Sequence, residues 1–280
     1  MSVVTISRML ASDGDEVAAA LASRLGYRLV GREDLVSLAS ALGEPDAIGR
    51  SPELRERSPS FWERLNEERS RYASVLRNVV LRLAAEDDVV IVGLGAGQLL
   101  RELKHVLRVQ IIAPPAQRLE RLMKSGSDER PGPLTREQAR ELIRGRDREA
   151  AGYIRYLFNV DWMEAHNWDL VLNTGRFDVS AAADAIAAVL QTGVARMQPA
   201  DRRRLADLTL AGTVESALLN HPGVWVNGLR VRASEGRITL EGEVIAEDDR
   251  EVVEQVVRTI EGVRAVENDL RIQPPPLTGM

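Results

Sequence analysis

The segment MLASDGDE, residues 9–16, contains residue types from which a phosphate-binding loop is built. It follows a short apolar segment and precedes a helical pattern, a position at which backbone N–H groups can approach a phosphate. Ser12 and Gly14 are candidates for binding a phosphate, because glycine in such a loop lets backbone N–H groups come close to the anion. The loop has no lysine, however, and three carboxylates surround it: Asp13, Asp15 and Glu16. Each would repel a polyphosphate in a water-poor cleft unless Mg²⁺ intervenes.

The same acidic residues also suit the start of a helix. Asp13 is a typical N-cap residue, and Glu16 three positions later would complete a capping box. Carboxylates near a helix N-terminus are also favoured by the helix dipole. Both interpretations stay open, and from this segment alone we favour capping over phosphate binding.

Apolar segments that alternate with helical patterns predict the elements that position these residues. After the first strand, Val17, Leu21 and Leu25 recur at helical spacing. This alternation predicts an α/β fold with a doubly wound parallel sheet, because helices must cover both faces of such a sheet. The segments predicted as strands are 3–6, 27–30, 89–97, 105–114 and 168–174.

Ligands of a doubly wound sheet bind at the carboxyl ends of its strands. Here those ends are residues 7–15, 31–32, 93–97 and the region around Pro114. The segment VVIVGLGAG has the spacing of a dinucleotide fingerprint, but it is the third strand and lacks a suitably placed acidic residue. We therefore interpret Gly93 and Gly95 as a tight turn from strand to helix.

The last 80 residues have a pattern of their own. A Gly-, Pro- and arginine-containing segment, 193–202, predicts a linker between a domain at 1–192 and a smaller one at 203–273, with a flexible tail at 274–280. The smaller domain has the predicted order α-β-β-α-β, with a hairpin that has one buried face. In that hairpin the arginines at 230 and 232 could pair with the glutamates at 241 and 243.

Composition limits the function classes. The 280-residue chain has a net charge of −5, so we expect no general binding to nucleic acid. It has no cysteine, which excludes disulfides and thiolate metal sites. Its three histidines are scattered along the sequence, so we propose no metal site. No apolar stretch reaches the roughly 18–20 residues that span a bilayer, and no signal peptide is visible. We expect a cytoplasmic protein that is not transmembrane.

Both parts resemble known families. Residues 1–190 are similar to the cytidylate kinase-like family of P-loop nucleoside monophosphate kinases through VTISR, LASRLGYRLVGRE, VVIVGLGAGQLLRE, VLRVQIIAP, RDREAAGYIRYLFNVDW and WDLVLNTGRF, in that order. Residues 207–273 resemble a BON domain through NGLRVRASEGRITLEGEV and IEGVRAVENDLRI. The resemblance implies a P-loop kinase-type sheet, and for the BON-like part a lipid or small ligand, or self-association.

The chain departs from the kinase family pattern at the positions that would face phosphates. Ala11 and Asp13 stand where that family has glycine, and Gly31 where it tends to have an acidic residue. Leu94 replaces the arginine of a Gly-Arg-Gly turn, which would be expected to hold the acceptor phosphate. Ala150 replaces an arginine expected three residues after an aspartate of the lid helix, a group that can be worth about 10³-fold in rate.

Arginines elsewhere could replace the missing groups. Arg140, Arg144, Arg148 and Arg155 share one helix face within about 80°, and a solvated face is the alternative explanation. By resemblance, Arg148 and Arg155 are the candidates for catalysis. The candidates for phosphate or nucleotide binding are Arg8, Ser12, Asp13, Gly14, Arg32, Gly93 and Gly95, with Arg118 and Arg121 as further cations.

Two functions compete on this evidence. In the favoured one, the kinase-like domain has a degenerate phosphate loop and serves as a nucleotide- or ligand-binding or regulatory module coupled to the BON-like domain. In the alternative, it is an active kinase that uses ATP and Mg²⁺ to phosphorylate CMP, dCMP or a related nucleotide. A purely structural role in oligomerisation, led by the BON-like domain, is the third option.

Overall fold

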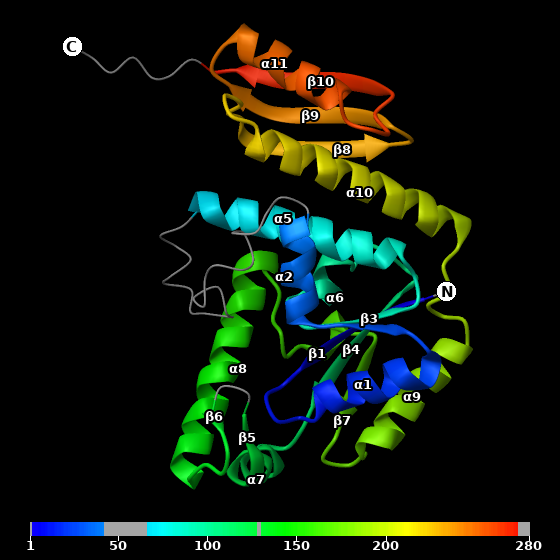
Figure 1. The fold of residues 1–280 in the computed structure, drawn as a ribbon, viewed down its shortest axis with the longest axis vertical. Helices are drawn as coiled ribbons and strands as arrows, with labels where there is room; N and C mark the ends of the chain where they lie inside the picture. The colour runs from blue at the N-terminus through cyan, green and yellow to red at the C-terminus, as the bar shows by residue number, and fades with distance from the viewer. Residues whose placement is uncertain (1, 42–65, 128–129, 274–280) are drawn as a thin grey trace, which may run out of the picture.

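The apolar segments form one five-stranded, all-parallel sheet in the order β2-β3-β1-β4-β7 (Figure 1). The computed structural model describes residues 2–41, 66–127 and 130–273. All four residues of β3 are buried, because helices cover both faces of the sheet. The strands are β1 (Val3–Arg8), β2 (Arg28–Val30), β3 (Val89–Val92), β4 (Val106–Ile112) and β7 (Leu170–Asn173).

Successive side chains of the strands enter two separate cores. Val4 of β1 packs in one core with Leu21 of α1 and Ile186 of α9. Val3 packs in the other with Leu76 of α5 and helices on that side. This alternation is the period of two expected of a strand with both faces covered. The helices concerned are α1 (Gly14–Leu25), α9 (Val179–Gln191), α2 (Arg32–Ala41), α5 (Asn66–Ala85) and α6 (Ala96–Leu99).

A lid-like excursion follows β4. It consists of α7 (Pro115–Ser125), the two short strands β5 (Gly126–Ser127) and β6 (Arg130–Pro131), and the long helix α8 (Arg136–Phe158). The side chain of Thr135 accepts from the Gln138 N–H and Gln138 bonds back to the Thr135 N–H, which fixes the start of α8. The 3-10 helix Ala165–Asn167 then leads into β7.

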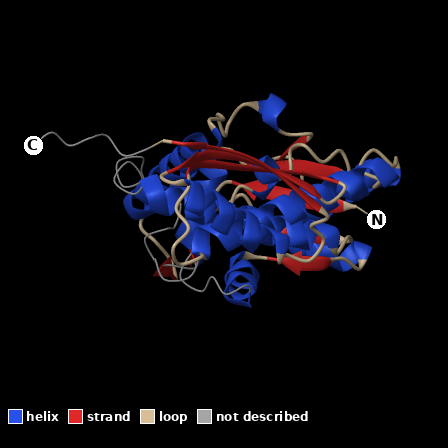
Figure 2. Ribbon diagram, turned by 90° about the horizontal axis from the view of Figure 1, so that it is seen from above, coloured by secondary structure: helices blue, strands red, loops and turns tan. Residues whose placement is uncertain are grey.

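The C-terminal part forms a separate sheet of three strands. The observed order of elements is α10 (Pro199–Asn220), β8 (Asn227–Ser234), β9 (Arg237–Val244), α11 (Glu247–Arg258) and β10 (Ala265–Ile272). β9 lies in the centre, antiparallel to β8 and parallel to β10. The predicted α-β-β-α-β order is confirmed, whereas the predicted tail 274–280 lies outside the described residues. Figure 2 shows both parts from the small-domain end of the molecule.

Helix α10 belongs to both parts. Its Leu205 and Leu208 are buried in the same core as α5, and its Val214 and Leu218 are buried in the core of the small domain. The helix begins at Pro199, so it starts within the predicted linker 193–202. In Figure 1, α10 lies between α5 and the small sheet.

Polar groups fix the contact between α5 and α10. The Asn78 amide donates to the Gly212 carbonyl at 2.9 Å and to the Ser216 hydroxyl at 3.0 Å. A methyl group placed on Gly212 would lie 2.7 Å from the Asn78 side-chain oxygen, so the close approach requires glycine. Burial raises the pKa of the Glu215 carboxyl in this contact, and Arg77 opposes the shift.

Candidate active site

A cleft of about 900 Å³ opens at the carboxyl ends of β1, β2 and β3, under the lid helix α8. This is the sheet edge at which the sequence predicts ligand binding. The cleft is therefore formed by the ends of strands and the loops that follow them. Its lining residues come from segments 8–11, 31–34 and 92–94, together with Asp15, Leu29, Arg146, Asp147, Ala150 and Trp162.

The loop after β1 keeps the backbone conformation that favours glycine without having the glycines. Ala11 and Asp13 have φ values of 58° and 57°. A residue with a Cβ in this left-handed region costs about 1 kcal/mol, somewhat less for aspartate. Gly14 remains necessary, because a methyl group there would lie 2.3 Å from the Cβ of Arg8. The loop thus has two non-glycine residues in a conformation that favours glycine, next to a glycine that the close approach of Arg8 requires.

The capping box expected at the start of α1 is wrong. Asp13 occupies the N-cap position, but its side chain makes no capping hydrogen bond, since the left-handed backbone turns it away from the helix. Its carboxylate instead lies 2.8 Å from the guanidinium of Arg121 on α7. Asp13 therefore forms an ion pair between the loop and α7 and does not cap α1.

The Arg121 side chain also bonds to backbone carbonyls of the loop and of the segment after β7. It donates to the carbonyls of Ala11 at 3.1 Å and of Thr174 at 3.0 Å. The buried hydroxyl of Thr174 in turn donates to the carbonyl of Ser12 at 2.7 Å. Ser12 is itself 1% exposed, and its hydroxyl donates to the Met9 carbonyl at 2.8 Å. The hydroxyl of Ser12, a candidate for phosphate binding, is therefore engaged inside the loop.

Arg118, one turn before Arg121, forms a buried ion pair with the lid. Its guanidinium donates to both carboxylate oxygens of Asp147, at 2.6 and 2.8 Å, and its Nε donates to the Leu10 carbonyl at 2.7 Å. The side chain is 2% exposed. Because removal of one partner would leave a charge without compensation, this pair joins the loop, α7 and α8 firmly.

Arg8 is one of the residues that line the cleft. Its Nε donates to the Asp15 carboxylate at 3.1 Å, so these two oppositely charged residues of the loop neutralise each other. A methyl group on Gly93 would lie 2.8 Å from a guanidinium nitrogen of Arg8. Arg8 and Gly93, two of the candidate binding residues, therefore meet at the cleft, while Arg32 borders it from the first turn of α2.

The turn after β3 is the predicted tight one. Gly93, Leu94 and Gly95 all have positive φ, and α6 begins at Ala96. A methyl group on Gly95 would lie 2.5 Å from the ring of Phe158 on α8, so Gly95 serves close packing against the lid helix. Gly95 does not line the cleft; its neighbour Leu94 does.

The two positions expected to carry arginine form part of one apolar surface. Leu94 is 5% exposed and Ala150 is 7% exposed, and both belong to the core that also contains Tyr153 and Trp162. The Tyr153 hydroxyl donates to the Leu94 carbonyl at 3.3 Å, which joins the lid helix to the turn. Leu94, Ala150 and Trp162 also line the cleft, so its floor is apolar here.

The catalytic candidates on the lid helix lie elsewhere. Arg148 is exposed and Arg155 pairs with Asp161 at 3.3 Å with 69% of its side chain exposed; neither lines the cleft. Arg146 lines it instead and pairs with Glu149 at 3.0 Å. The prediction chose the face of the helix that carries most arginines, which is the solvated face. Only the packing of α8 identifies Arg146.

Trp162 was not predicted as a site residue. Its indole N–H donates to the Ser7 hydroxyl at 2.8 Å, and its carbonyl accepts from the Gln110 amide at 2.8 Å. The side chain is 3% exposed and borders the cleft. The sequence shows only that an aromatic residue follows the end of α8 by four positions. Whether its side chain reaches the cleft depends on how this segment packs against the sheet.

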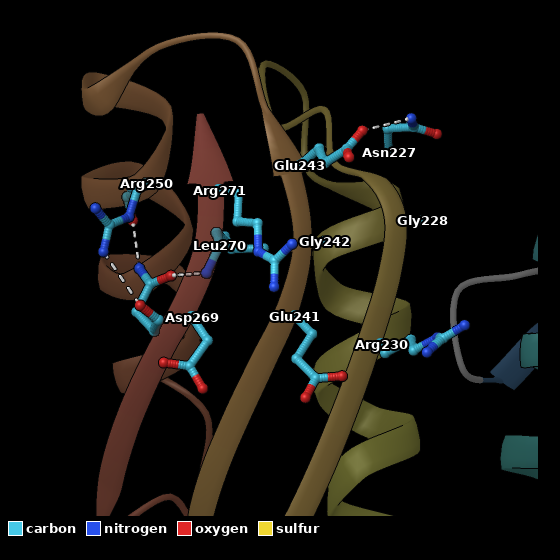
Figure 3. A pocket seen from close by; sticks show the side chains of 11 residues that line it. Asn227, Gly228, Arg230, Glu241, Gly242, Glu243, Arg250, Asp269, Leu270 and Arg271 are labelled. Carbon is cyan, nitrogen blue, oxygen red and sulfur yellow. Dashed lines mark hydrogen bonds between the residues drawn. The ribbon is translucent and has the colours of Figure 1, made fainter. Parts of the chain in front are cut away.

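A second hollow, of about 830 Å³, lies on the open face of the small sheet (Figure 3). It has equal numbers of arginines and carboxylates. The predicted cross-strand pairing is found between Arg232 and Glu241, and the Asn227 amide donates to Glu243 at 3.2 Å. Its charged lining residues are Arg230, Glu241, Glu243, Arg250, Asp269 and Arg271.

Neither a membrane-spanning helix nor a cluster of metal ligands is found in the part of the chain that the structure describes. No helix there combines the length and the apolar character needed to cross a bilayer. In the same residues, no group of three or more histidine, aspartate or glutamate side chains is arranged to hold a metal ion.

Comparison with known proteins gives a match to two family models. The model of the cytidylate kinase-like family matches residues 3–176, and that of the BON domain matches residues 206–274. No curated protein sequence shows significant similarity to the chain.

Similar folds occur among solved structures. An uncharacterized protein from Eubacterium ventriosum is 18% identical with a TM-score of 0.52, over 69% of this chain and 99% of that one. Shikimate kinase from Bacteroides thetaiotaomicron is 16% identical with a TM-score of 0.41, over 68% and 98%. Shikimate kinase from Acinetobacter baumannii, in complex with shikimate, is 14% identical with a TM-score of 0.38, over 71% and 96%. The first structure, with a TM-score above 0.5 and an identity of 18%, is similar to this chain in fold alone.

Proposed function

The chain belongs to the cytidylate kinase-like family and carries a BON domain, and from this premise we propose that its kinase-like domain is a ligand-binding regulatory module without efficient phosphoryl transfer. The module binds a nucleotide-related or other small ligand in the cleft and is coupled to the BON domain through α10. We place it in the cytoplasm.

The observation that carries the proposal is the apolar floor made by Leu94 and Ala150. Phosphoryl transfer depends on positioning and on neutralising the charge of the transferred group. Both side chains lie where an arginine would be expected, and both are packed into the core. An arginine introduced at either position would have to displace core side chains, so the loss of charge is accompanied by repacking.

The residues around the loop fit Mg²⁺ and ATP poorly. The Ser12 hydroxyl bonds to the chain itself, and the loop has no lysine. Asp13 and Asp15 place carboxylates beside the loop, where they pair with Arg121 and Arg8. Of these two arginines, Arg8 lines the cleft, so its charge is already partly neutralised there. We therefore derive no catalytic step that involves ATP.

One observation favours the alternative of an active kinase for CMP or a related nucleotide. Three arginines, Arg8, Arg32 and Arg146, line the cleft. If Asp15 and Glu149 released two of them on binding, the cleft would gain cations at its rim. A test for phosphoryl transfer separates this alternative from the proposed function.

The test is phosphorus NMR of the purified protein with ATP, Mg²⁺ and CMP over hours at high protein concentration. We expect the ATP signals to stay unchanged while an active bacterial cytidylate kinase converts ATP in a parallel tube. Formation of ADP together with CDP would overturn the proposal.

A matched pair of variants decides whether any turnover belongs to the cleft. Arg146→Ala removes an arginine that lines the cleft, and Arg148→Ala removes an exposed arginine half a turn away on the same helix. Turnover by this protein would be lost in Arg146→Ala and kept in Arg148→Ala. Turnover kept in both variants would indicate a contaminating kinase.

The BON domain supplies the regulatory partner in this proposal. The BON domain would bind a lipid or small ligand, or another copy of the chain. Any conformational change on this binding would reach the kinase-like domain through α10, which shares a core with α5. Helix α5 precedes β3, and β3 ends at the cleft turn. This succession of packed elements supports a coupling between the two domains.

A further inference from the structure

The cleft lining carries nearly equal numbers of positive and negative groups. Three arginines and four carboxylates line it, and a polyphosphate would need a clear excess of positive charge there. The lining arginines are Arg8, Arg32 and Arg146, and the lining carboxylates are Asp15, Glu33, Asp34 and Asp147.

Most of the positive charge is already paired within the chain. Arg8 bonds to Asp15, and Arg146 bonds to Glu149. Arg32 is exposed and has no ion-pair partner among residues 2–41, 66–127 and 130–273. Among the described residues, Arg32 is therefore the lining arginine that can accept a single negative charge.

The cations behind the loop are paired as well. Arg121 is held by Asp13, and Arg118 is held by Asp147 in a buried, two-oxygen contact. Neither arginine lines the cleft, and each already has a carboxylate partner. These two cations therefore add no free positive charge for a ligand phosphate.

The other features of the cleft suit a flat ring and hydroxyl groups better than they suit a phosphate. Leu94, Ala150 and Trp162 provide an apolar floor on which a flat ring can pack. At the β2 end, the exposed Glu33 and the half-buried Asp34 offer carboxylate oxygens, which accept hydrogen bonds from hydroxyls. The Asp34 carboxylate already accepts the Gly31 N–H at 2.8 Å, which fixes its position.

We infer that the cleft binds a nucleoside and rejects its phosphorylated forms. The ring packs on the apolar floor, the sugar hydroxyls donate to the carboxylates in the first turn of α2, and at most one negative charge is accepted near Arg32. This inference rests on the proposed function and extends it, since it states the chemical class of the ligand.

The experiment is isothermal titration calorimetry of the full chain with cytidine, CMP and CTP, with EDTA present so that no Mg²⁺ screens the phosphates. The three probes share base and sugar and differ in charge. We expect cytidine to bind most tightly and CTP at least about tenfold more weakly. Absence of cytidine binding, or tighter binding of CMP or CTP than of cytidine, would overturn the inference.

Surface variants link the result to the paired charges without endangering the fold. The Asp15 side chain is 66% exposed, and Asp15→Asn should lower the Kd of CTP about three- to tenfold by releasing Arg8, while the Kd of cytidine stays unchanged. Asp248→Asn, an exposed carboxylate on α11, is the control and should alter neither. Equal effects of both variants on CTP would also refute the inference.

The two proposals fail in different ways. Appearance of CDP in the NMR experiment refutes the absence of catalysis, whatever the affinities. Preference for CTP in calorimetry with no turnover leaves the regulatory module in place and refutes only the nucleoside specificity.

Discussion

At the scale of single residues, the loop after β1 places two non-glycine residues in a backbone conformation that favours glycine. Ala11 and Asp13 adopt left-handed φ values that glycine would adopt at no cost. Arg121 compensates by bonding to the Ala11 carbonyl and to the Asp13 carboxylate. Tertiary contacts thus hold a conformation that local preference disfavours.

Gly14 and Gly145 are a matched pair of helical glycines with opposite surroundings. A methyl group on Gly14 would lie 2.3 Å from the Arg8 Cβ, whereas one on Gly145 meets nothing within 4 Å. We expect Gly14→Ala to lower the free energy of unfolding by about 1–3 kcal/mol and Gly145→Ala to raise it by about 0.5–1 kcal/mol. Urea denaturation measures both, and equal effects would show that Arg8 does not restrict the loop.

The Arg118–Asp147 pair makes a second residue-scale prediction. Asp147→Asn leaves a guanidinium that is 2% exposed without its counter-charge, so we expect a loss of about 2–4 kcal/mol in the free energy of unfolding. Glu164→Gln, which removes an exposed carboxylate beside His166, should change it by less than about 0.5 kcal/mol. Similar small losses in both variants would mean that the lid is not held by this pair.

At the scale of elements, α10 is the feature that joins the two domains. It has no single apolar face, because it buries residues against α5 on one side and against the small sheet on the other. A helix of this kind shows little amphipathic pattern in sequence. Its contact with α5 also contains a carboxyl group, Glu215, whose pKa is raised by burial.

Glu215 should make the α5–α10 contact less stable as the pH rises. Because its folded-state pKa lies above the ordinary value of 4.5, the folded state binds the proton more tightly, and stability falls as pH rises from 4.5 through the folded-state pKa. Glu215→Gln should therefore stabilise the chain at pH 7 and have little effect below pH 4.5. Thermal unfolding across pH measures this, with the exposed Glu251→Gln on α11 as the control; the same pH trend in both variants would contradict it.

At the scale of the whole molecule, the BON domain is fused to the kinase-like domain by a shared helix and is not hung on a flexible linker. The small domain has its own core, which includes Val214, Leu240 and Val257. A fragment of residues 199–280 should therefore fold, but it would expose the side of α10 that α5 covers. Its circular dichroism should show a cooperative unfolding transition.

Leu208→Glu separates the two roles of α10. Leu208 is 7% exposed and packs in the core shared with α5. In the full chain the substitution should cost about 3 kcal/mol or more, because it buries a charge in an apolar contact. In the fragment the position is open to solvent, so the cost should be below about 0.5 kcal/mol. A large loss in the fragment would show that Leu208 supports the small domain itself.

Much of the fold follows from sequence pattern alone. Continuous apolar runs such as β3 and the alternation in β9 report burial directly, so the parallel sheet, the small α-β-β-α-β domain and the strand ends at the cleft are predictable. The replacement of arginine by Leu94 and Ala150 is likewise visible in sequence once the family pattern is compared.

The tertiary structure alone decided which charges meet. Asp13 looked like a helix cap because capping is local, yet its partner Arg121 is 108 residues away and is brought near only by the packing of α7. Arg146 and Arg148 are equivalent by composition, and the side on which α8 packs selects the first for the cleft. Ion pairing and helix orientation depend on contacts between distant segments, and for that reason local sequence could identify the site but could not describe its charge balance.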